Sequence, residues 1–253
     1  MLPGAMSLRQ GDPQASGRRA LLLLGLALSG AALAIFPLDR PISERAVTWE
    51  PTAPVIDALF RSIKAFGKAD VLLVVLFAAC LTRLRRPAVY GLVSLALIAL
   101  PVHALKFLVG RERPWHSGGS FPSGDTASVV AAFVPLALFV PAARLPVALL
   151  ALLVAAFRVI ASYHYPSDVF AGAALACFCA ALALAITPRR FLAIRPRIAW
   201  PLFSLSVAVS LFVALTSARN SPSSRFVLFG LPIVLVLLWL ERRRLARFAK
   251  PRG

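Results

Sequence analysis

The segments KFLVGRERP (residues 106–114), FPSGD (residues 121–125) and RVIASYHYPSD (residues 158–168) hold most of the charged residues of an otherwise apolar stretch. We name them the first, second and third polar islands. The residues between them are mostly Ala, Leu and Val. Ionisable residues inside apolar segments cost free energy, and they often mark functional sites. Lys, Arg, His and Asp at the ends of apolar runs predict an anion-binding site that contains a nucleophile.

The composition indicates an integral membrane protein. Of the 253 residues, 59% are hydrophobic, whereas soluble domains are about half apolar. The net charge is +18, but the basic residues fall between apolar runs, which indicates membrane topology and no nucleic-acid partner. Cys80, Cys177 and Cys179 lie inside apolar runs, so we expect buried thiols rather than disulfides or a metal site.

Eight apolar runs predict an all-α, polytopic membrane protein with a six-helix core and two additional C-terminal transmembrane helices. The runs cover residues 20–38, 68–82, 88–109, 126–140, 145–163, 168–187, 200–216 and 226–240. The first run has a rival interpretation as a signal peptide, because Arg18 and Arg19 precede it and residues 32–34 mimic a cleavage site. The long tail ahead of these arginines is atypical of a signal peptide and favours a span.

The remaining segments connect these runs. We expect residues 1–19 to form a disordered cytoplasmic tail, residues 39–54 a charged loop and residues 242–253 a basic cytoplasmic tail. Residues 55–66 show helical spacing of apolar positions, which predicts either an amphipathic surface helix or an extension of the next span. The core is expected to cover residues 20–187. The two further spans, within residues 188–241, are expected to serve packing or oligomer contacts.

The distribution of basic residues predicts the orientation in the membrane. With eight spans, 17 of the 28 Lys and Arg residues fall on the side that holds both termini. The other side holds 11, of which four belong to the polar islands. Because basic loops stay in the cytoplasm, both termini are expected to be cytoplasmic. All three islands then meet on the opposite face, which is the periplasmic face of a bacterial inner membrane.

The first two islands supply groups that suit phosphate. Lys106 offers a point charge, and Arg113 offers a forked pair of donors for phosphate oxygens. Ser123 and Gly124 lie where an apolar helix begins, and backbone amides at a helix N-terminus bind anions. Arg158 of the third island lies inside a span, where a bound anion is its natural partner.

The third island also supplies a nucleophile. His164 ends one apolar run and Asp168 begins the next, with Pro166 between them to force a turn. Asp168 can accept the Nδ1 proton of His164 and leave Nε2 free to attack phosphorus.

The three islands together resemble the motifs of the type 2 phosphatidate phosphatase and vanadium haloperoxidase superfamily, in its membrane lipid phosphatase branch. The resemblance rests on Lys-x6-Arg-Pro, Pro-Ser-Gly and Arg-x5-His-x3-Asp in this order, and it covers the six-span core. It implies that His164 becomes transiently phosphorylated, that Asp168 orients it, and that Lys106, Arg113, Ser123, Gly124 and Arg158 hold phosphate. It implies no metal and no cofactor.

The second island departs from the family pattern. The family has a His, which protonates the leaving group, where this chain has Asp125. An ordinary Asp has a pKa of about 3.9 against about 6.5 for His, so a carboxyl is a poor acid at neutral pH. Either another group takes the role, or the leaving group needs little help, as in a diphosphate, or turnover is slow. If a bound phosphate keeps Asp125 protonated, Asp125 itself acts as the acid. A second departure is Phe157, which stands where the family usually has Ser.

Three further residues are candidates for the site. His116 is either a substitute acid or a solvated loop residue. His103 lies one helical turn before Lys106, and it either lines the pocket or packs between helices. Arg111 either pairs with Glu112 at the surface or contacts a lipid headgroup.

We therefore expect a membrane lipid phosphatase that hydrolyses a lipid phosphate or diphosphate, such as polyprenyl diphosphate, phosphatidate or a lipid A phosphate. Membrane lipids are its expected partners. One alternative is a phosphotransferase that passes the phosphate to a lipid or sugar acceptor. Another is a catalytically impaired protein that only binds phospholipids.

Overall fold

A computed structural model of the chain describes residues 13–47, 63–188, 192, 195–216 and 226–248. Within these residues every named element is a helix, which confirms the all-α prediction. The α-helices are α1 (Pro13–Ile35), α2 (Asp39–Val47), α4 (Ala69–Cys80), α5 (Arg85–Val109), α6 (Gly124–Phe139), α7 (Arg144–Ile160), α8 (Pro166–Ile186), α9 (Pro196–Thr216) and α11 (Leu231–Phe248). Short helical turns, η1 (Phe36–Leu38), η2 (Pro141–Ala143) and η4 (Phe226–Gly230), precede α2, α7 and α11.

The predicted membrane spans are present as apolar helices. Five helical segments of the described chain are long and apolar enough to cross a bilayer: residues 14–46, 85–109, 141–160, 166–186 and 197–216. Three shorter apolar helices cover residues 69–80, 124–139 and 226–239. Each of the eight predicted spans therefore coincides with an apolar helix.

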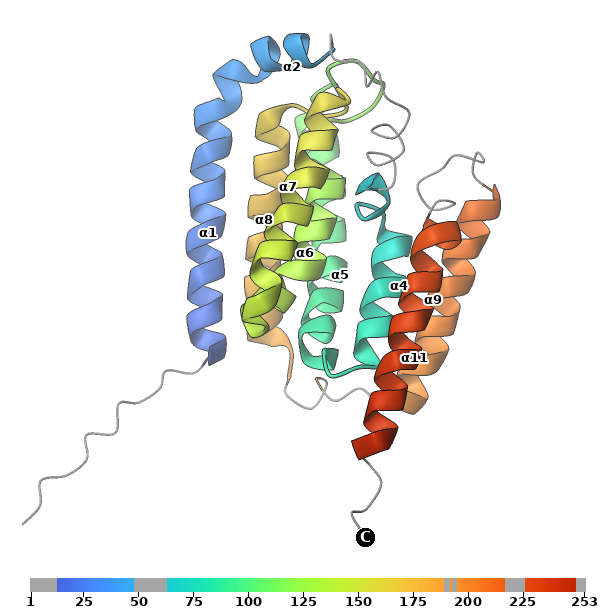
Figure 1. The fold of residues 1–253 in the computed structure, drawn as a ribbon. Helices are drawn as coiled ribbons and strands as arrows, with labels where there is room; N and C mark the ends of the chain where they lie inside the picture. Colours follow the sequence, from blue (N-terminus) through green and yellow to red (C-terminus); the bar gives the residue numbers. More distant parts are fainter. Residues whose placement is uncertain (1–12, 48–62, 189–191, 193–194, 217–225, 249–253) are drawn as a thin grey trace, which may run out of the picture.

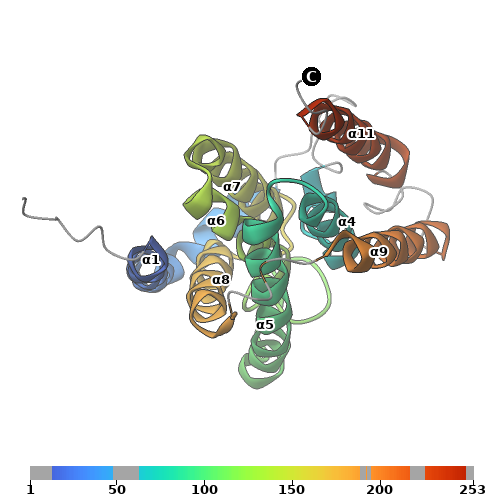
Figure 2. The same cartoon turned by 90° about the horizontal axis from the view of Figure 1, so that it is seen from below.

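The helices form a bundle in which α8 occupies a central position. Helices α5, α6 and α7 pack around it, and α1 lies along its outer side (Figure 1). The view along the bundle shows α1 at one edge and α9 and α11 at the opposite edge, next to α4 (Figure 2). The two C-terminal helices therefore support the core through α4, where Ser210 Oγ donates to Asp70 Oδ2 at 3.2 Å.

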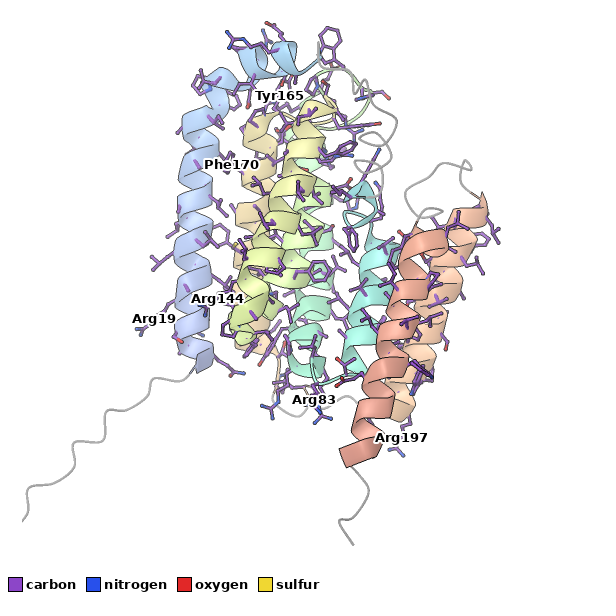
Figure 3. The ribbon with its side chains drawn as sticks, viewed as in Figure 1. Arg19, Arg83, Arg144, Tyr165, Phe170 and Arg197 are labelled. Atoms are coloured by element: carbon purple, nitrogen blue, oxygen red, sulfur yellow. The ribbon has the colours of Figure 1, made fainter. Side chains whose placement is uncertain are left out.

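The polar islands meet at one end of this bundle, as the sequence predicted. Helix α5 ends at Gly110, whose φ of 59° is a left-handed conformation that glycine adopts without steric cost. Helix α6 begins after Ser123, and α8 begins at Pro166, a residue favoured in the first turn. The labelled arginines Arg19, Arg83, Arg144 and Arg197 lie toward the end opposite Tyr165 (Figure 3).

Helix boundaries differ from the prediction at the start of the chain, after α1 and at the C-terminus, where α11 extends through Phe248 into the predicted tail of residues 242–253. Residues 13–19 belong to α1, because Pro is tolerated in the first turn and the following residues include good helix formers. Residues 39–47 form α2 rather than a loop, with the acidic Asp39 in its first turn. Most of the predicted amphipathic helix, residues 55–62, lies outside the described residues, whereas residues 63–65 are helical.

The three cysteines are free and buried, as expected.

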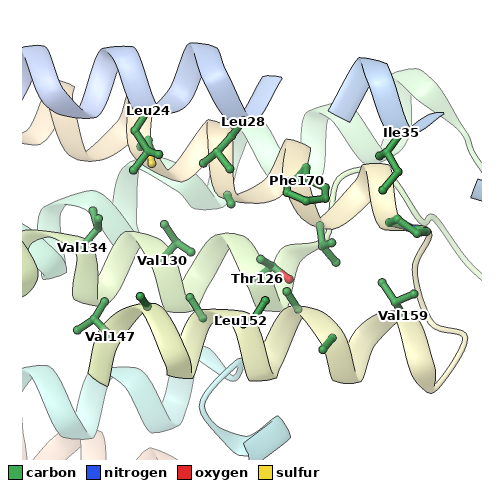
Figure 4. A pocket seen from close by; sticks show the side chains of 18 of the residues that line it. Leu24, Leu28, Ile35, Thr126, Val130, Val134, Val147, Leu152, Val159 and Phe170 are labelled. Atoms are coloured by element: carbon green, nitrogen blue, oxygen red, sulfur yellow. The ribbon is translucent and has the colours of Figure 1, made fainter. Parts of the chain in front are cut away.

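An apolar pocket of about 650 Å³ lies between α1, α6, α7 and α8 (Figure 4). Leu24 and Leu28 face it from α1, and Val130 and Leu152 face it from α6 and α7. Its walls are hydrocarbon over most of their length, so it extends the lipid-compatible surface into the bundle.

The closest approach of α5 and α6 requires a glycine at position 91. A Cβ built on Gly91 would lie 2.4 Å from the carbonyl oxygen of Ala132, which is closer than van der Waals contact allows. We predict that Gly91→Ala lowers the free energy of unfolding by about 1–3 kcal/mol, as overpacking does. Thermal unfolding of the purified protein in detergent measures this change.

Gly30→Ala is the matched control, because a Cβ at Gly30 would meet nothing within 4 Å. Alanine there should be neutral or should stabilise the protein by up to about 1 kcal/mol through helix propensity. Equal effects of the two substitutions would contradict the packing described for α5 and α6.

Candidate active site

A polar cavity of about 190 Å³ lies where the islands meet. Five cations, one carboxylate, one imidazole, one phenol and one glycine line it: Lys64, Lys68, Lys106, Arg113, Arg158, Asp125, His164, Tyr163 and Gly124. Six of these nine residues were predicted from the islands. With five positive charges against one carboxylate, the cavity is suited to an anion of high charge.

His164 follows the end of α7 and is 1% exposed. Its Nδ1 lies 2.7 Å from the carbonyl oxygen of Ser120. A carbonyl oxygen only accepts hydrogen bonds, so Nδ1 carries the proton and donates it. The lone pair of this imidazole is therefore on Nε2, which is the atom that a nucleophilic histidine uses.

Asp168 contributes to this arrangement differently from the prediction. Its Oδ2 lies 3.7 Å from His164 Nδ1, beyond hydrogen-bond distance. Instead Oδ2 accepts hydrogen bonds from the hydroxyl of Ser120 and from the backbone N–H of Tyr165, at 2.9 Å for the latter. Asp168 thus holds Ser120, whose carbonyl oxygen in turn orients His164.

Arg111 lies outside the cavity and joins two buried carboxylates. Its Nη1 donates to Asp168 Oδ1 at 2.9 Å, and its Nη2 donates to Asp39 Oδ2 at 2.7 Å. The guanidinium also stacks on the ring of Tyr165, with 3.9 Å between its central carbon and the ring centroid. The predicted surface pair with Glu112 is therefore wrong, because Arg111 forms its ion pairs with Asp39 and Asp168 instead.

Arg158 is placed to bind an anion in the cavity. It extends from the last turn of α7 and is 4% exposed. Its Nη1 lies 3.1 Å from Asp125 Oδ2, although the angle does not make a hydrogen bond. Its Nε and Nη1 have no hydrogen-bond partner among the described residues, and buried donors of this kind are costly unless a ligand accepts from them.

Asp125 stands between two cations at the start of α6. Besides Arg158, its carboxylate contacts Lys68, with 3.4 Å between Oδ1 and Nζ. Each of its two carboxylate oxygens therefore lies next to a cation, Oδ1 next to Lys68 and Oδ2 next to Arg158. This geometry gives Asp125 the role of positioning Lys68 and Arg158.

The remaining phosphate-site candidates divide into cavity and support residues. Lys106 Nζ donates to the carbonyl of Gly119 at 2.9 Å, and Arg113 Nε donates to the same oxygen at 3.4 Å. Gly124 lines the cavity with its backbone. Ser123 is buried behind it, and its hydroxyl shares a hydrogen bond with Thr126 at 3.0 Å, so its role is to support α6.

The two other histidines do not line the cavity. His116 stacks on the ring of Tyr163, with 3.9 Å between the centroids, and its Nε2 lies 3.2 Å from the carbonyl oxygen of Ala161. His103 is exposed on α5. Neither prediction of His103, as a pocket residue or as a packing residue between helices, agrees with this exposure.

Three cavity residues were missed by sequence analysis. Lys64 and Lys68 precede α4 and were counted only as topology charges. Tyr163 lies within the third island, and its ring receives the Lys64 ammonium at 4.3 Å and the Arg158 guanidinium at 4.3 Å. No sequence motif marked the two lysines: Lys64 lies in a helical turn that ends at residue 65, and Lys68 is the extended residue that precedes α4.

The surroundings of the cavity also lower the pKa values of two of its groups, His164 and Lys64. Burial lowers the pKa of His164 from its usual 6.5, and the charges of Arg158 and Lys106 lower it further, against the opposing effect of Asp168. Burial likewise lowers the pKa of Lys64 below its usual 10.5, with Arg158 and Lys68 adding to the shift and Tyr163 opposing it. His164 is therefore neutral, and nucleophilic, at pH 7.

Comparison with known proteins gives one family match. Residues 115–192, which include the second and third islands, match the model of the PAP2 superfamily. Over this segment the chain is similar to the PAP2 superfamily. No curated protein matches it in a sequence comparison.

Two solved structures share the fold. One is a transmembrane PAP2-type phosphatidylglycerolphosphate phosphatase from Bacillus subtilis, with a TM-score of 0.53 and 24% identity, over 68% of this chain and 98% of that chain. The other is LpxE from Aquifex aeolicus, with a TM-score of 0.50 and 25% identity, over 59% of this chain and 94% of that chain. The family and the fold together place this protein among the phosphatases, which hydrolyse phosphoric esters.

The lowered proton affinity of His164 can be measured directly, because the chain contains only three histidines. We predict that the His164 imidazole titrates below pH 6.5 in the substrate-free protein, since burial and nearby cations disfavour the charged ring. NMR of protein labelled at the histidine rings gives the midpoint, and the signal missing from His164→Gln provides the assignment. A midpoint above 6.5 would mean that Asp168 outweighs burial and the cations.

Proposed function

We propose that this protein hydrolyses a lipid phosphate or diphosphate through a phosphohistidine formed on His164. The observation that carries the proposal is the hydrogen bond from His164 Nδ1 to the carbonyl of Ser120, at 2.7 Å in a cavity lined by five cations. This bond leaves the Nε2 lone pair available to a phosphorus atom held by those cations.

The reaction has two steps in this proposal. The arginines and lysines bind the phosphate oxygens and stabilise the charge of the transition state. Nε2 of His164 attacks phosphorus and the lipid alcohol, or lipid monophosphate, leaves. Water then attacks the phosphohistidine and releases phosphate.

A lipid substrate is supported by the position of the cavity at one end of an apolar bundle, where a headgroup can enter while its chains stay in the membrane. The arginines at the opposite end support a cytoplasmic location for that end. We therefore place the site at the periplasmic face of a bacterial inner membrane, with both termini in the cytoplasm.

His164→Ala is predicted to reduce phosphate release to below a few per cent of wild type, because it removes the nucleophile. Arg158→Ala should be nearly as damaging through lost phosphate binding. Phosphate release by purified protein, measured across lipid monophosphates and diphosphates, tests both changes. His103→Ala is the matched control: it removes an exposed histidine outside the cavity and should leave turnover unchanged. Wild-type turnover by His164→Ala would contradict the phosphohistidine route.

The orientation is tested separately. A reporter enzyme that is active only in the periplasm should stay silent when fused after Gly253, because the C-terminus is placed in the cytoplasm. The same reporter inserted in the loop between α5 and α6 should be active. Strong activity of the Gly253 fusion would overturn the proposed topology.

A further inference from the structure

The proposed reaction requires a proton when the substrate is a lipid monophosphate. Its leaving group is an alkoxide, which is about as strong a base as hydroxide and leaves readily only when it is protonated. A diphosphate expels instead a phosphate whose second pKa is about 6, and it needs little help. Asp125 occupies the position where the motif predicts an acid, but its carboxylate forms ion pairs with Lys68 and Arg158.

The other groups of the cavity differ in their ability to donate a proton to the leaving group. Arginine side chains do not release a proton in proteins, which excludes Arg113 and Arg158. Lys106 Nζ is directed at the carbonyl oxygens of Gly119 and Ser120, at 2.9 and 3.4 Å. Two lysines and one phenol remain: Lys64, Lys68 and Tyr163.

Of these three groups, Lys68 is the one that forms an ion pair with Asp125 among the described residues. It directly precedes α4, and its side chain is 36% exposed, so its ammonium reaches both the cavity and water. Gly67 holds this backbone against α6, since a Cβ there would lie 2.6 Å from Asp125 Cβ. The close packing and the ion pair together fix Nζ beside the position of the predicted acid.

Lys64 is held in a different way. Its ammonium lies over the ring of Tyr163, 4.3 Å from the centroid, and among the described residues it forms no ion pair with Asp125. It carries the same charge as Lys68 and lines the same cavity. Lys64 is therefore suited to binding phosphate, and it serves as a matched control for Lys68.

We propose that Lys68, positioned by Asp125, is the general acid that protonates the leaving group in this protein. The inference rests on the proposed function and adds a catalytic residue to it. The pair Lys68 and Asp125 then replaces a single histidine: the carboxylate positions the ammonium, and the ammonium donates.

The proton balance of the two steps is closed. In the first step the Nε2 lone pair of His164 forms the N–P bond, the P–O bond to the lipid breaks, and a proton passes from Lys68 Nζ to the leaving oxygen. The products are the lipid alcohol, phosphohistidine and a neutral amine. In the second step this amine takes a proton from water as the water oxygen bonds to phosphorus, and the N–P bond breaks. Phosphate leaves, and His164 and the Lys68 ammonium are restored.

The test compares two substrates with the same prenyl chain, a monophosphate and a diphosphate. Lys68→Gln should lower kcat for the monophosphate by roughly 10²–10⁴-fold, the usual contribution of general acid catalysis. For the diphosphate the loss should be under about tenfold, because that leaving group is weakly basic. Lys68→Arg should show the same contrast, since arginine keeps the charge but does not donate the proton.

Lys64→Gln should slow both substrates alike, because it removes charge but no acid. Adding Asp125→His to Lys68→Gln should restore monophosphate turnover by supplying an imidazole acid. Thermal unfolding in detergent checks that each variant is folded.

The outcomes separate the two proposals. Equal losses for both substrates in Lys68→Gln and Lys68→Arg would overturn the acid role while leaving the phosphatase intact. The same contrast in Tyr163→Phe or Lys64→Gln, with Lys68→Gln unaffected, would transfer the role to that residue and also overturn the proposal. Absence of phosphate release from either lipid by wild-type protein would reject the proposed function, and this inference with it.

Discussion

The buried carboxylate of Asp168 is the interaction on which the rest of the site depends. A carboxylate that is 0% exposed is tolerable only when charged and polar partners surround it. Asp168 obtains these partners from Arg111, from the hydroxyl of Ser120 and from the backbone of Tyr165. Arg111 in turn reaches Asp39 at the start of α2. Segments that are distant in the sequence therefore meet around the carboxylate of Asp168. Ser120 is one of the residues held there, and its carbonyl oxygen orients His164.

The cations of the cavity are stable next to one another because each has local support. Lys106 and Arg113 share the carbonyl oxygen of Gly119, and Arg158 and Lys68 share Asp125. Like charges at close range still cost free energy, and a bound phosphate relieves that cost. Asp125 neutralises part of the repulsion while leaving the cavity strongly positive. This balance explains how an acidic residue can occupy an anion site without closing it.

The sequence was sufficient to predict the helices and most of the site. Long apolar runs allow little other than membrane helices, and one topology brought the islands to the same end. Their spacing also predicted His164, Arg158 and Lys106 as cavity residues. The contact between Asp39 and Arg111 could not be predicted, because the two residues are 72 positions apart in the sequence and Asp39 lies in the first turn of α2. Lys64 and Lys68 were missed for a similar reason: their positions arise from tertiary contacts, of Lys64 with Tyr163 and of Lys68 with Asp125, not from a motif. A direct hydrogen bond from His164 to Asp168 was expected from their spacing, whereas in the folded protein the carbonyl oxygen of Ser120 accepts the hydrogen bond from His164 Nδ1.

Capture of the phosphorylated enzyme tests the central claim most directly, since the geometry assigns one atom, Nε2 of His164, as the nucleophile. Purified protein is mixed with a lipid phosphate labelled at phosphorus, the reaction is stopped within its first turnover with alkali, and the label is located by mass spectrometry of peptides. The account predicts one phosphoryl group per protein, stable in alkali and labile in acid, on the peptide that contains His164. Label on another residue, or phosphate release without any labelled protein during turnover, would contradict it.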